Sequence, residues 1–161
     1  MPVWGRALAF LLVVPGSIAG WLPWVLAGAP YDLASVRRGL WRLGALVALA
    51  GWGVLLACAR EFATRGRGTP APYDPPRQLV TSGFYRLVRN PMYTGVLIAI
   101  LGQEVWYRSV RVAIYGAIAW LCFHGWVTLY EEPALTRSFG DAYREYCRRV
   151  PRWVPLGRDR T

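Results

Sequence analysis

Four stretches of apolar residues, separated by segments rich in arginine, restrict what this sequence can fold into. They cover residues 7–29, 43–59, 92–101 and 110–130. An α-helix rises about 1.5 Å per residue, so roughly 20 apolar residues cross a hydrocarbon core of about 30 Å. The third stretch is short even when it is extended to Trp106. We therefore predict an all-α integral membrane bundle of about four transmembrane helices, with a third span that is short, tilted or re-entrant.

The composition agrees with a membrane location. The chain of 161 residues is 55% hydrophobic and 17% charged, which is more apolar and less charged than a typical soluble domain. We predict one domain over 1–161, divided into two N-terminal spans (1–59), a loop rich in proline and glycine (60–90) and a C-terminal half (91–161). A signal peptide with Arg6 as its basic region is the alternative for the first stretch, but that stretch is too long.

The distribution of arginine indicates how the chain lies in the membrane. All 19 basic residues are arginine, and nine acidic residues leave a net charge of +10. A GC-rich genome also produces this exclusive use of arginine. Fourteen arginines fall in the N-terminus, residues 60–90 and the C-terminal tail, against five in the two opposite loops. The excess of basic residues predicts that both termini and the long loop are cytoplasmic, at a bacterial inner membrane. The charge favours contact with anionic lipid headgroups over nucleic acid, because the arginines flank apolar spans.

Several kinds of site are absent from the sequence. The three cysteines (Cys58, Cys122 and Cys147) have no metal or redox spacing, and we interpret them as structural. A single histidine without a cysteine cluster predicts no metal site. There is no glycine-rich phosphate loop and no serine-histidine-acid pattern. Soluble dinucleotide-binding folds are excluded, because nothing indicates alternating strands and helices.

Two segments have patterns that predict their packing. The second apolar stretch is rich in glycine and alanine, which let membrane helices approach closely, so we expect it in the centre of the bundle. Residues 136–150 predict an amphipathic helix that lies in the membrane interface and ends before Pro151. Its apolar face has helical spacing and consists of Phe139, Tyr143, Tyr146, Cys147 and Val150.

A first polar cluster precedes the third stretch. Asn90 before Pro91 predicts a helix N-cap with proline at the first helical position. The free amides and the positive end of the helix dipole could bind an anionic group such as a carboxylate. The alternative is an ordinary capped helix start with Arg89 reaching toward the headgroups.

A second polar cluster lies at the end of the fourth stretch. His124, Thr128, Glu131 and Glu132 form a polar stripe there. Adjacent helical residues point about 100° apart, so we expect at most one of the two glutamates to enter a shared pocket. The alternative is that both acids pair with nearby arginines. We interpret His124 as a hydrogen-bonded interhelical residue rather than a catalytic base.

Together these motifs resemble the isoprenylcysteine carboxyl methyltransferase and phospholipid methyltransferase superfamily. The resemblance covers roughly residues 76–155, about half of the chain. The commoner family pattern has histidine where this chain has Asn90, which can hydrogen-bond but does not titrate at neutral pH. The residues that carry the resemblance are Gly83-Phe84-Tyr85, Arg89-Asn90-Pro91-Met92-Tyr93-Thr94-Gly95, Glu131-Glu132, Leu135, Phe139-Gly140, Tyr143, Tyr146 and Val150-Pro151-Arg152.

The resemblance implies an enzyme that transfers a methyl group from S-adenosylmethionine to a lipophilic substrate with a carboxylate, amine or thiol. The product of the cofactor would be S-adenosylhomocysteine, and the partners would be membrane lipids and a lipid or lipophilic small molecule, with no nucleic acid and no metal. The resemblance implies that the C-terminal half (91–161) binds the cofactor, and that Arg89 and Glu132 are catalytic residues. The residues that it implies for cofactor binding are Tyr85, Val88, Arg89, Asn90, Tyr93, Gly95, Glu131, Glu132 and Tyr143.

Two other functions are compatible with the sequence. A non-catalytic membrane accessory or sensor protein could retain the fold, and Asn90 in place of histidine is the feature that favours it. A small transporter or channel subunit is suggested by His124 and Glu104 in or near apolar stretches. Binding of the cofactor would separate the enzyme from both.

Overall fold

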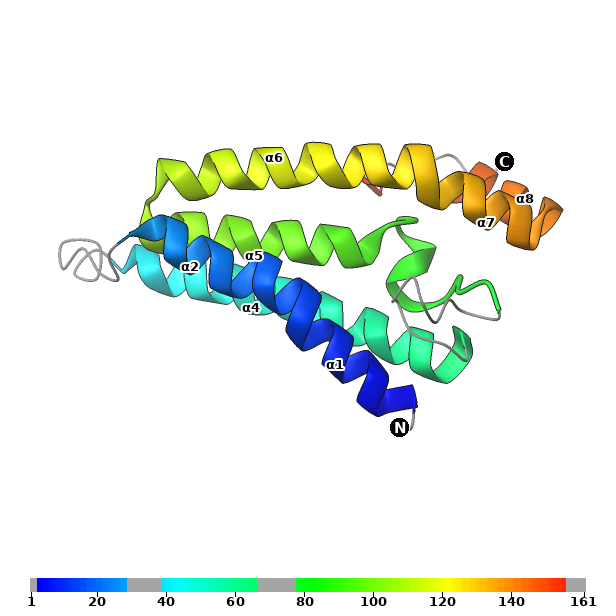
Figure 1. Ribbon diagram of the computed structural model, residues 1–161, viewed down its shortest axis with the longest axis horizontal. Coiled ribbons are helices and arrows are strands. Elements are labelled where there is room, and N and C mark those ends of the chain that lie inside the picture. The colour runs from blue at the N-terminus through cyan, green and yellow to red at the C-terminus, as the bar shows by residue number, and fades with distance from the viewer. Residues whose placement is uncertain (1–2, 29–38, 67–77, 156–161) are drawn as a thin grey trace.

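The computed structural model describes residues 3–28, 39–66 and 78–155, and this part of the chain contains helices and no strand (Figure 1). The shorter elements are the π-helical turns η1 (Ser17–Trp21), η2 (Phe62–Gly66) and η4 (Val127–Glu131) and the 3₁₀ turn η3 (Gly83–Arg86). The α-helices are α1 (Val3–Gly16), α2 (Leu22–Ala27), α4 (Leu40–Glu61), α5 (Pro91–Tyr107), α6 (Val110–Trp126), α7 (Glu132–Phe139) and α8 (Asp141–Arg149).

Within the described residues, three helical segments are long and apolar enough to cross a membrane, and the protein is an integral membrane protein. They are Ala9–Ala27, Trp41–Gly66 and Val110–Phe139. Helix α5 has 17 residues, so it is about 25 Å long, which is less than the hydrocarbon core. The third span is therefore short, as predicted, and the total of four spans stays a prediction.

Helices α4 and α5 form the centre of the bundle, with α6 on the other side of α5 (Figure 1). Their backbones touch at glycines. A Cβ atom added to Gly51 would lie 2.5 Å from the Gly95 carbonyl oxygen and 2.5 Å from the Ala99 nitrogen. A Cβ atom added to Gly44 would lie 2.6 Å from the Gly102 carbonyl oxygen. The expectation that the small residues of the second stretch permit close packing is confirmed.

The C-terminal helices differ from the prediction. The helix that contains the fourth apolar stretch does not end with that stretch at Tyr130, because it continues without interruption from α6 through η4 and α7 to Phe139. Gly140 has a φ of +53°, which L-amino acids rarely adopt, and it ends α7. The predicted C-terminal amphipathic helix is present as α8, with Tyr143 and Tyr146 on its buried face. Its predicted bounds of 136–150 are wrong, because Gly140 divides these residues between the end of α7 and α8.

The N-terminal span and the long loop also differ in their limits. The first span is helical through α1, η1 and α2 and ends at Ala27, before Gly28 with a φ of +75°. The predicted loop at 60–90 begins later than expected, because the helix of α4 continues through η2 to Gly66. The prolines of its centre, at residues 70–76, lie outside the described residues.

The polar elements gather at one end of the bundle. Figure 1 shows η3, the start of α5, and helices α7 and α8 at the same end, where α4 also finishes. A connection between α5 and α6 lies at the opposite end. Which end faces the cytoplasm stays a prediction.

Candidate active site

The site begins at the N-terminus of α5. Asn90 is the N-cap and Pro91 is the first helical residue, as predicted. The Asn90 side chain does not cap the helix, however, because its Nδ2 donates a hydrogen bond to the Arg152 carbonyl oxygen at 3.2 Å. The Asn90 carbonyl oxygen accepts from the Thr94 nitrogen at 3.1 Å and from the Thr94 hydroxyl at 3.0 Å. The side chain of the cap residue is therefore used to hold another segment.

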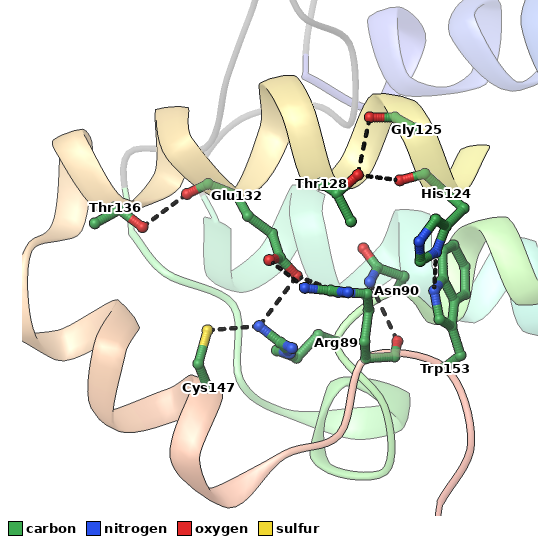
Figure 2. Close-up of polar contacts among 10 residues, drawn as sticks. Arg89, Asn90, His124, Gly125, Thr128, Glu132, Thr136, Cys147 and Trp153 are labelled. Atoms are coloured by element: carbon green, nitrogen blue, oxygen red, sulfur yellow. Dashed lines mark hydrogen bonds and ion pairs between the residues drawn. The ribbon is translucent and has the colours of Figure 1, made fainter. Parts of the chain in front are cut away.

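Glu132, the first residue of α7, is held by two arginines. The Arg152 guanidinium donates to both of its carboxylate oxygens, at 2.8 and 2.9 Å. Nη1 of Arg89 lies 3.1 Å from Oε1 of the same carboxylate, and both of these side chains are largely buried. Figure 2 shows Arg89 and Glu132 turned toward each other, with Cys147 of α8 beside the guanidinium. The charge of Glu132 is thus balanced within the protein.

Residues 150–153, which we name the C-terminal strap, bind the start of α5 and the end of α6. The Pro151 carbonyl oxygen accepts from the Arg89 nitrogen at 2.8 Å. Nε1 of Trp153 donates to Nδ1 of His124 at 3.1 Å (Figure 2). The interpretation of His124 as a hydrogen-bonded residue is confirmed, although its partner lies in the strap and not on another helix.

Glu131 has a different environment from its neighbour. Its Oε2 accepts a hydrogen bond from the Tyr93 hydroxyl at 2.9 Å. Among the described residues it makes no ion pair with an arginine. The alternative that both acids pair with arginines therefore holds for Glu132 alone, and within the described part of the chain no positive charge contacts the Glu131 carboxylate.

A cavity of about 380 Å³ lies between α5, α7 and α8 and contains both glutamates in its wall. The expectation that at most one of them would enter is wrong. Glu131 ends a π-helical turn, whose i→i+5 hydrogen bonds give more residues per turn and a smaller angle between neighbours. The lining residues are Phe62, Leu79, Val80, Tyr85, Arg89, Asn90, Met92, Tyr93, Trp126, Tyr130, Glu131, Glu132, Ala134, Leu135, Ser138, Phe139, Tyr143 and Tyr146.

Tyrosines from α8 and η3 close one side of the cavity. The Tyr146 hydroxyl donates to the Tyr85 carbonyl oxygen at 2.7 Å, which fixes α8 on η3. Burial raises the pKa of Tyr85, Tyr143 and Tyr146 well above the usual value of a phenol. These phenols are therefore neutral hydrogen-bonding groups over the physiological pH range.

The structure brings most of the sequence-predicted site residues together. Two do not line the cavity: Val88 is buried, and Gly95 packs against α4, with the Gly51 carbonyl oxygen 3.0 Å from an added Cβ. Gly95 therefore has a packing role here. The predicted residues that line the cavity are Tyr85, Arg89, Asn90, Tyr93, Glu131, Glu132 and Tyr143.

Sequence reasoning missed three contributions to the site. Arg152 belongs to the last motif of the resemblance, but its ion pair with Glu132 was not predicted. Cys147 was assigned to an apolar face, whereas its sulfur accepts from Nη1 of Arg89 at 2.7 Å. Phe62 lines the cavity from η2, and nothing in its sequence surroundings signals that position.

One donor of the site is unsatisfied. Nε of Arg89 is buried and has no hydrogen-bond partner among the described residues. A buried donor without a partner costs about 1–3 kcal/mol. An acceptor atom on a ligand in the cavity would remove that cost.

Comparison with known proteins places the chain in a family. Residues 42–142 match the phospholipid methyltransferase family model, and the chain belongs to this family. It is 37% identical over 79 residues to the protein-S-isoprenylcysteine O-methyltransferase of Schizosaccharomyces pombe, covering 48% of this chain and 33% of that protein. It is 39% identical over 80 residues to protein-S-isoprenylcysteine O-methyltransferase B of Arabidopsis thaliana, covering 49% and 40%. The chain thus spans well under half the length of these two relatives.

A further similarity extends over more of the chain. The chain is 30% identical over 154 residues to the nickel-cobalt-cadmium resistance protein NccN of Alcaligenes xylosoxydans xylosoxydans, covering 83% of this chain and 72% of that protein. The resemblance inferred from the motifs is confirmed. The relatives of this chain thus include proteins named for methyl transfer and a protein named for metal resistance.

Proposed function

We propose that the protein transfers a methyl group from S-adenosylmethionine to a lipophilic substrate at the membrane. The observation that carries the proposal is the cavity at the polar end of the bundle, in which no counter-charge from the described residues contacts the half-buried carboxylate of Glu131. Membership of the phospholipid methyltransferase family and the names of the isoprenylcysteine methyltransferases support methyl transfer. The proposal includes cytoplasmic termini and a bacterial inner membrane.

The residues of the cavity fit this cofactor. Its volume of about 380 Å³ falls in the range of about 300–1,000 Å³ that small-molecule sites occupy. The unsatisfied Nε of Arg89 suits a carboxylate, and tyrosine and tryptophan rings suit an aromatic base and a cation. When bound, S-adenosylmethionine supplies a methyl group carried by a positively charged sulfur.

Glu131 is the residue that we assign to the positive charge of the cofactor. A carboxylate in a site of low dielectric stabilises a nearby cation more strongly than it does in water. The Tyr93 hydroxyl fixes its orientation at 2.9 Å. Glu132, favoured by the sequence, has its charge balanced by Arg89 and Arg152. We therefore assign Glu132 to holding those arginines, and Glu131 to electrostatic stabilisation of the transfer.

The substrate is assigned to the apolar part of the cavity. Phe62, Leu79, Met92 and Leu135 contribute to its wall. Trp126 and Tyr130 also line the cavity, yet these residues are 45% and 53% exposed on a membrane-spanning helix. A lipophilic molecule could therefore enter from the bilayer, and alignment with the cofactor in a site shielded from water would accelerate the transfer. The accepting atom is a carboxylate oxygen, an amine nitrogen or a thiol sulfur.

The sensor alternative rested on Asn90 in place of histidine. In the structure the Asn90 amide donates to the Arg152 carbonyl oxygen. That hydrogen bond requires no titrating group, so asparagine in place of histidine can still hold the C-terminal strap. The presence of Asn90 therefore does not favour loss of activity.

A methyl-transfer assay tests the substrate half of the proposal. The full chain in lipid nanodiscs is incubated with S-adenosylmethionine labelled in its methyl group and with total lipid extract or prenylcysteine analogues. We expect label in the organic phase, and we expect Glu131→Gln to reduce it by at least tenfold while Glu104→Gln, at the opposite end of α5, leaves it unchanged. Labelled products confined to the aqueous phase would contradict a lipophilic acceptor.

A further inference from the structure

The outer surface of α7 and α8 carries arginines that the candidate site does not use. The side chains of Arg144, Arg148 and Arg149 are 61%, 73% and 72% exposed, and Arg137 is also exposed. Glu145 is shared between Arg148 and Arg149, and Asp141 pairs with Arg144. Four arginines and two acids leave this surface, which we name the α7–α8 basic surface, with a net positive charge.

The opposite face of α8 belongs to the cavity. Tyr143 and Tyr146 are 3% and 8% exposed, and both line the cavity wall. They pack against Leu79, Leu135 and Phe139. Helix α8 therefore separates the cavity on one side from its arginine-bearing surface on the other.

The length of the preceding helix places α8 at the depth of the lipid headgroups. The continuous helical segment Val110–Phe139 has 30 residues, so it is about 45 Å long against a hydrocarbon core of about 30 Å. Along the membrane normal about ten of its residues therefore extend beyond the hydrocarbon, and its acidic residues are Glu131 at the end of η4 and Glu132 at the start of α7. Helix α8 follows directly after Gly140, and Figure 1 shows α7 and α8 together at the end of the bundle.

We propose that the α7–α8 basic surface binds the anionic phospholipid headgroups of the adjoining leaflet, and that this contact holds α8 on the cavity. Lipid is the partner that the geometry favours, because α7 is the direct continuation of a membrane-spanning helix and α8 lies within a few residues of it. Opposite charge supplies the attraction, which acts over about one Debye length. Arg60, Arg65 and Arg86 are exposed on elements that finish at the same end of the bundle and add to the attraction.

The contact has a consequence for the cavity. A ligand that binds one conformation better than another shifts the population toward it. Anionic lipid would favour the docked position of α8, in which Tyr143 and Tyr146 complete the wall. The cavity would then bind its cofactor more tightly beside anionic lipid than beside neutral lipid. This effect on cofactor binding rests on the proposed function.

Hydrogen exchange of the full chain in nanodiscs tests the contact without any ligand. Amide exchange of residues 141–149 is compared in discs of phosphatidylcholine alone and in discs that also contain phosphatidylglycerol, at low and high salt. The test variant is Arg144→Gln with Arg148→Gln, and the matched control is Arg42→Gln with Arg108→Gln at the other end of the bundle. A second test pair, Arg137→Gln with Arg149→Gln, serves if the first fails to fold.

We expect the amides of α8 to exchange about fivefold to tenfold more slowly beside anionic lipid. The reason is that the attraction of one arginine near an anionic surface changes an equilibrium by about fivefold. The difference should vanish at high salt and in the test variant, and persist in the control. Equal exchange in both lipids, or an equal lipid effect in the test variant, would overturn the proposal. S-adenosylhomocysteine affinity is measured in parallel: its absence would count against the proposed function and leave the lipid contact standing.

Discussion

Glu132 and Arg152 are joined by two parallel hydrogen bonds of 2.8 and 2.9 Å, although 20 residues separate them in the sequence. The pair fastens the C-terminal strap to α7. The strap in turn binds the start of α5 through the Arg152 and Pro151 carbonyl oxygens. The position of the cavity wall at α5 therefore depends on a residue that follows α8.

Replacing Arg152 with lysine should weaken cofactor binding. Lysine carries the charge but not the fork that contacts both carboxylate oxygens, and a hydrogen bond to a charged group contributes about 1.5–3 kcal/mol. We expect the Kd of S-adenosylhomocysteine to rise by about tenfold, measured by calorimetry. Arg149→Lys is the control, because its ion pair with Glu145 is exposed and contributes little. Equal Kd values for the two variants would contradict the role given to Arg152.

Adding a methyl group at Gly51 should destabilise the bundle. The new Cβ would lie 2.5 Å from backbone atoms of Gly95 and Ala99, which are not free to rotate away. Overpacking of this kind costs about 1–3 kcal/mol or more. Gly53→Ala on the same helix is the matched control, since its Cβ meets nothing within 4 Å and should add up to about 1 kcal/mol of helix stability. If the Tm of Gly51→Ala in a thermal melt equals or exceeds that of Gly53→Ala, the close packing of α4 and α5 is refuted.

Alkaline pH should destabilise the protein through its buried phenols. The folded-state pKa values of Tyr85, Tyr143 and Tyr146 are raised by burial above the value of about 10 in an unfolded chain. The unfolded state therefore loses protons first, and the stabilising effect of the neutral phenols is complete below pH of about 10 and declines above it. We expect the Tm to fall above that pH.

Ultraviolet absorbance of phenolate measures this effect. Ionisation of the buried tyrosines should accompany unfolding. Tyr143→Phe removes one phenol that must ionise, so it should shift the alkaline unfolding transition to higher pH. Complete ionisation of all tyrosines near pH 10 in folded protein would contradict their burial.

The parts of the fold that depend on local sequence were predictable. The Asn90-Pro91 pair correctly marks the beginning of α5, because an N-cap and a first-turn proline are local requirements. The apolar stretches mark the spans for the same reason. The division at Gly140 was missed, because the apolar spacing of 136–150 continues across the glycine while its positive φ breaks the helix.

The parts of the site that depend on distant contacts were not predictable. No local pattern joins Arg152 to Glu132, and a glycine inside a motif does not reveal whether it serves packing, as Gly95 does, or a ligand. Both glutamates reach the cavity because η4 is π-helical, and the residue spacing alone assumes a regular α-helix.

The most direct test of the proposed function is calorimetric titration of the full chain in nanodiscs with S-adenosylmethionine and with S-adenosylhomocysteine. These two ligands differ in the positive charge on sulfur, which the carboxylate of Glu131 is proposed to stabilise. The wild type should bind both, Glu131→Gln should weaken S-adenosylmethionine more than S-adenosylhomocysteine, and Glu104→Gln should change neither. Failure of folded wild-type protein to bind either ligand would contradict the methyltransferase assignment of the cavity.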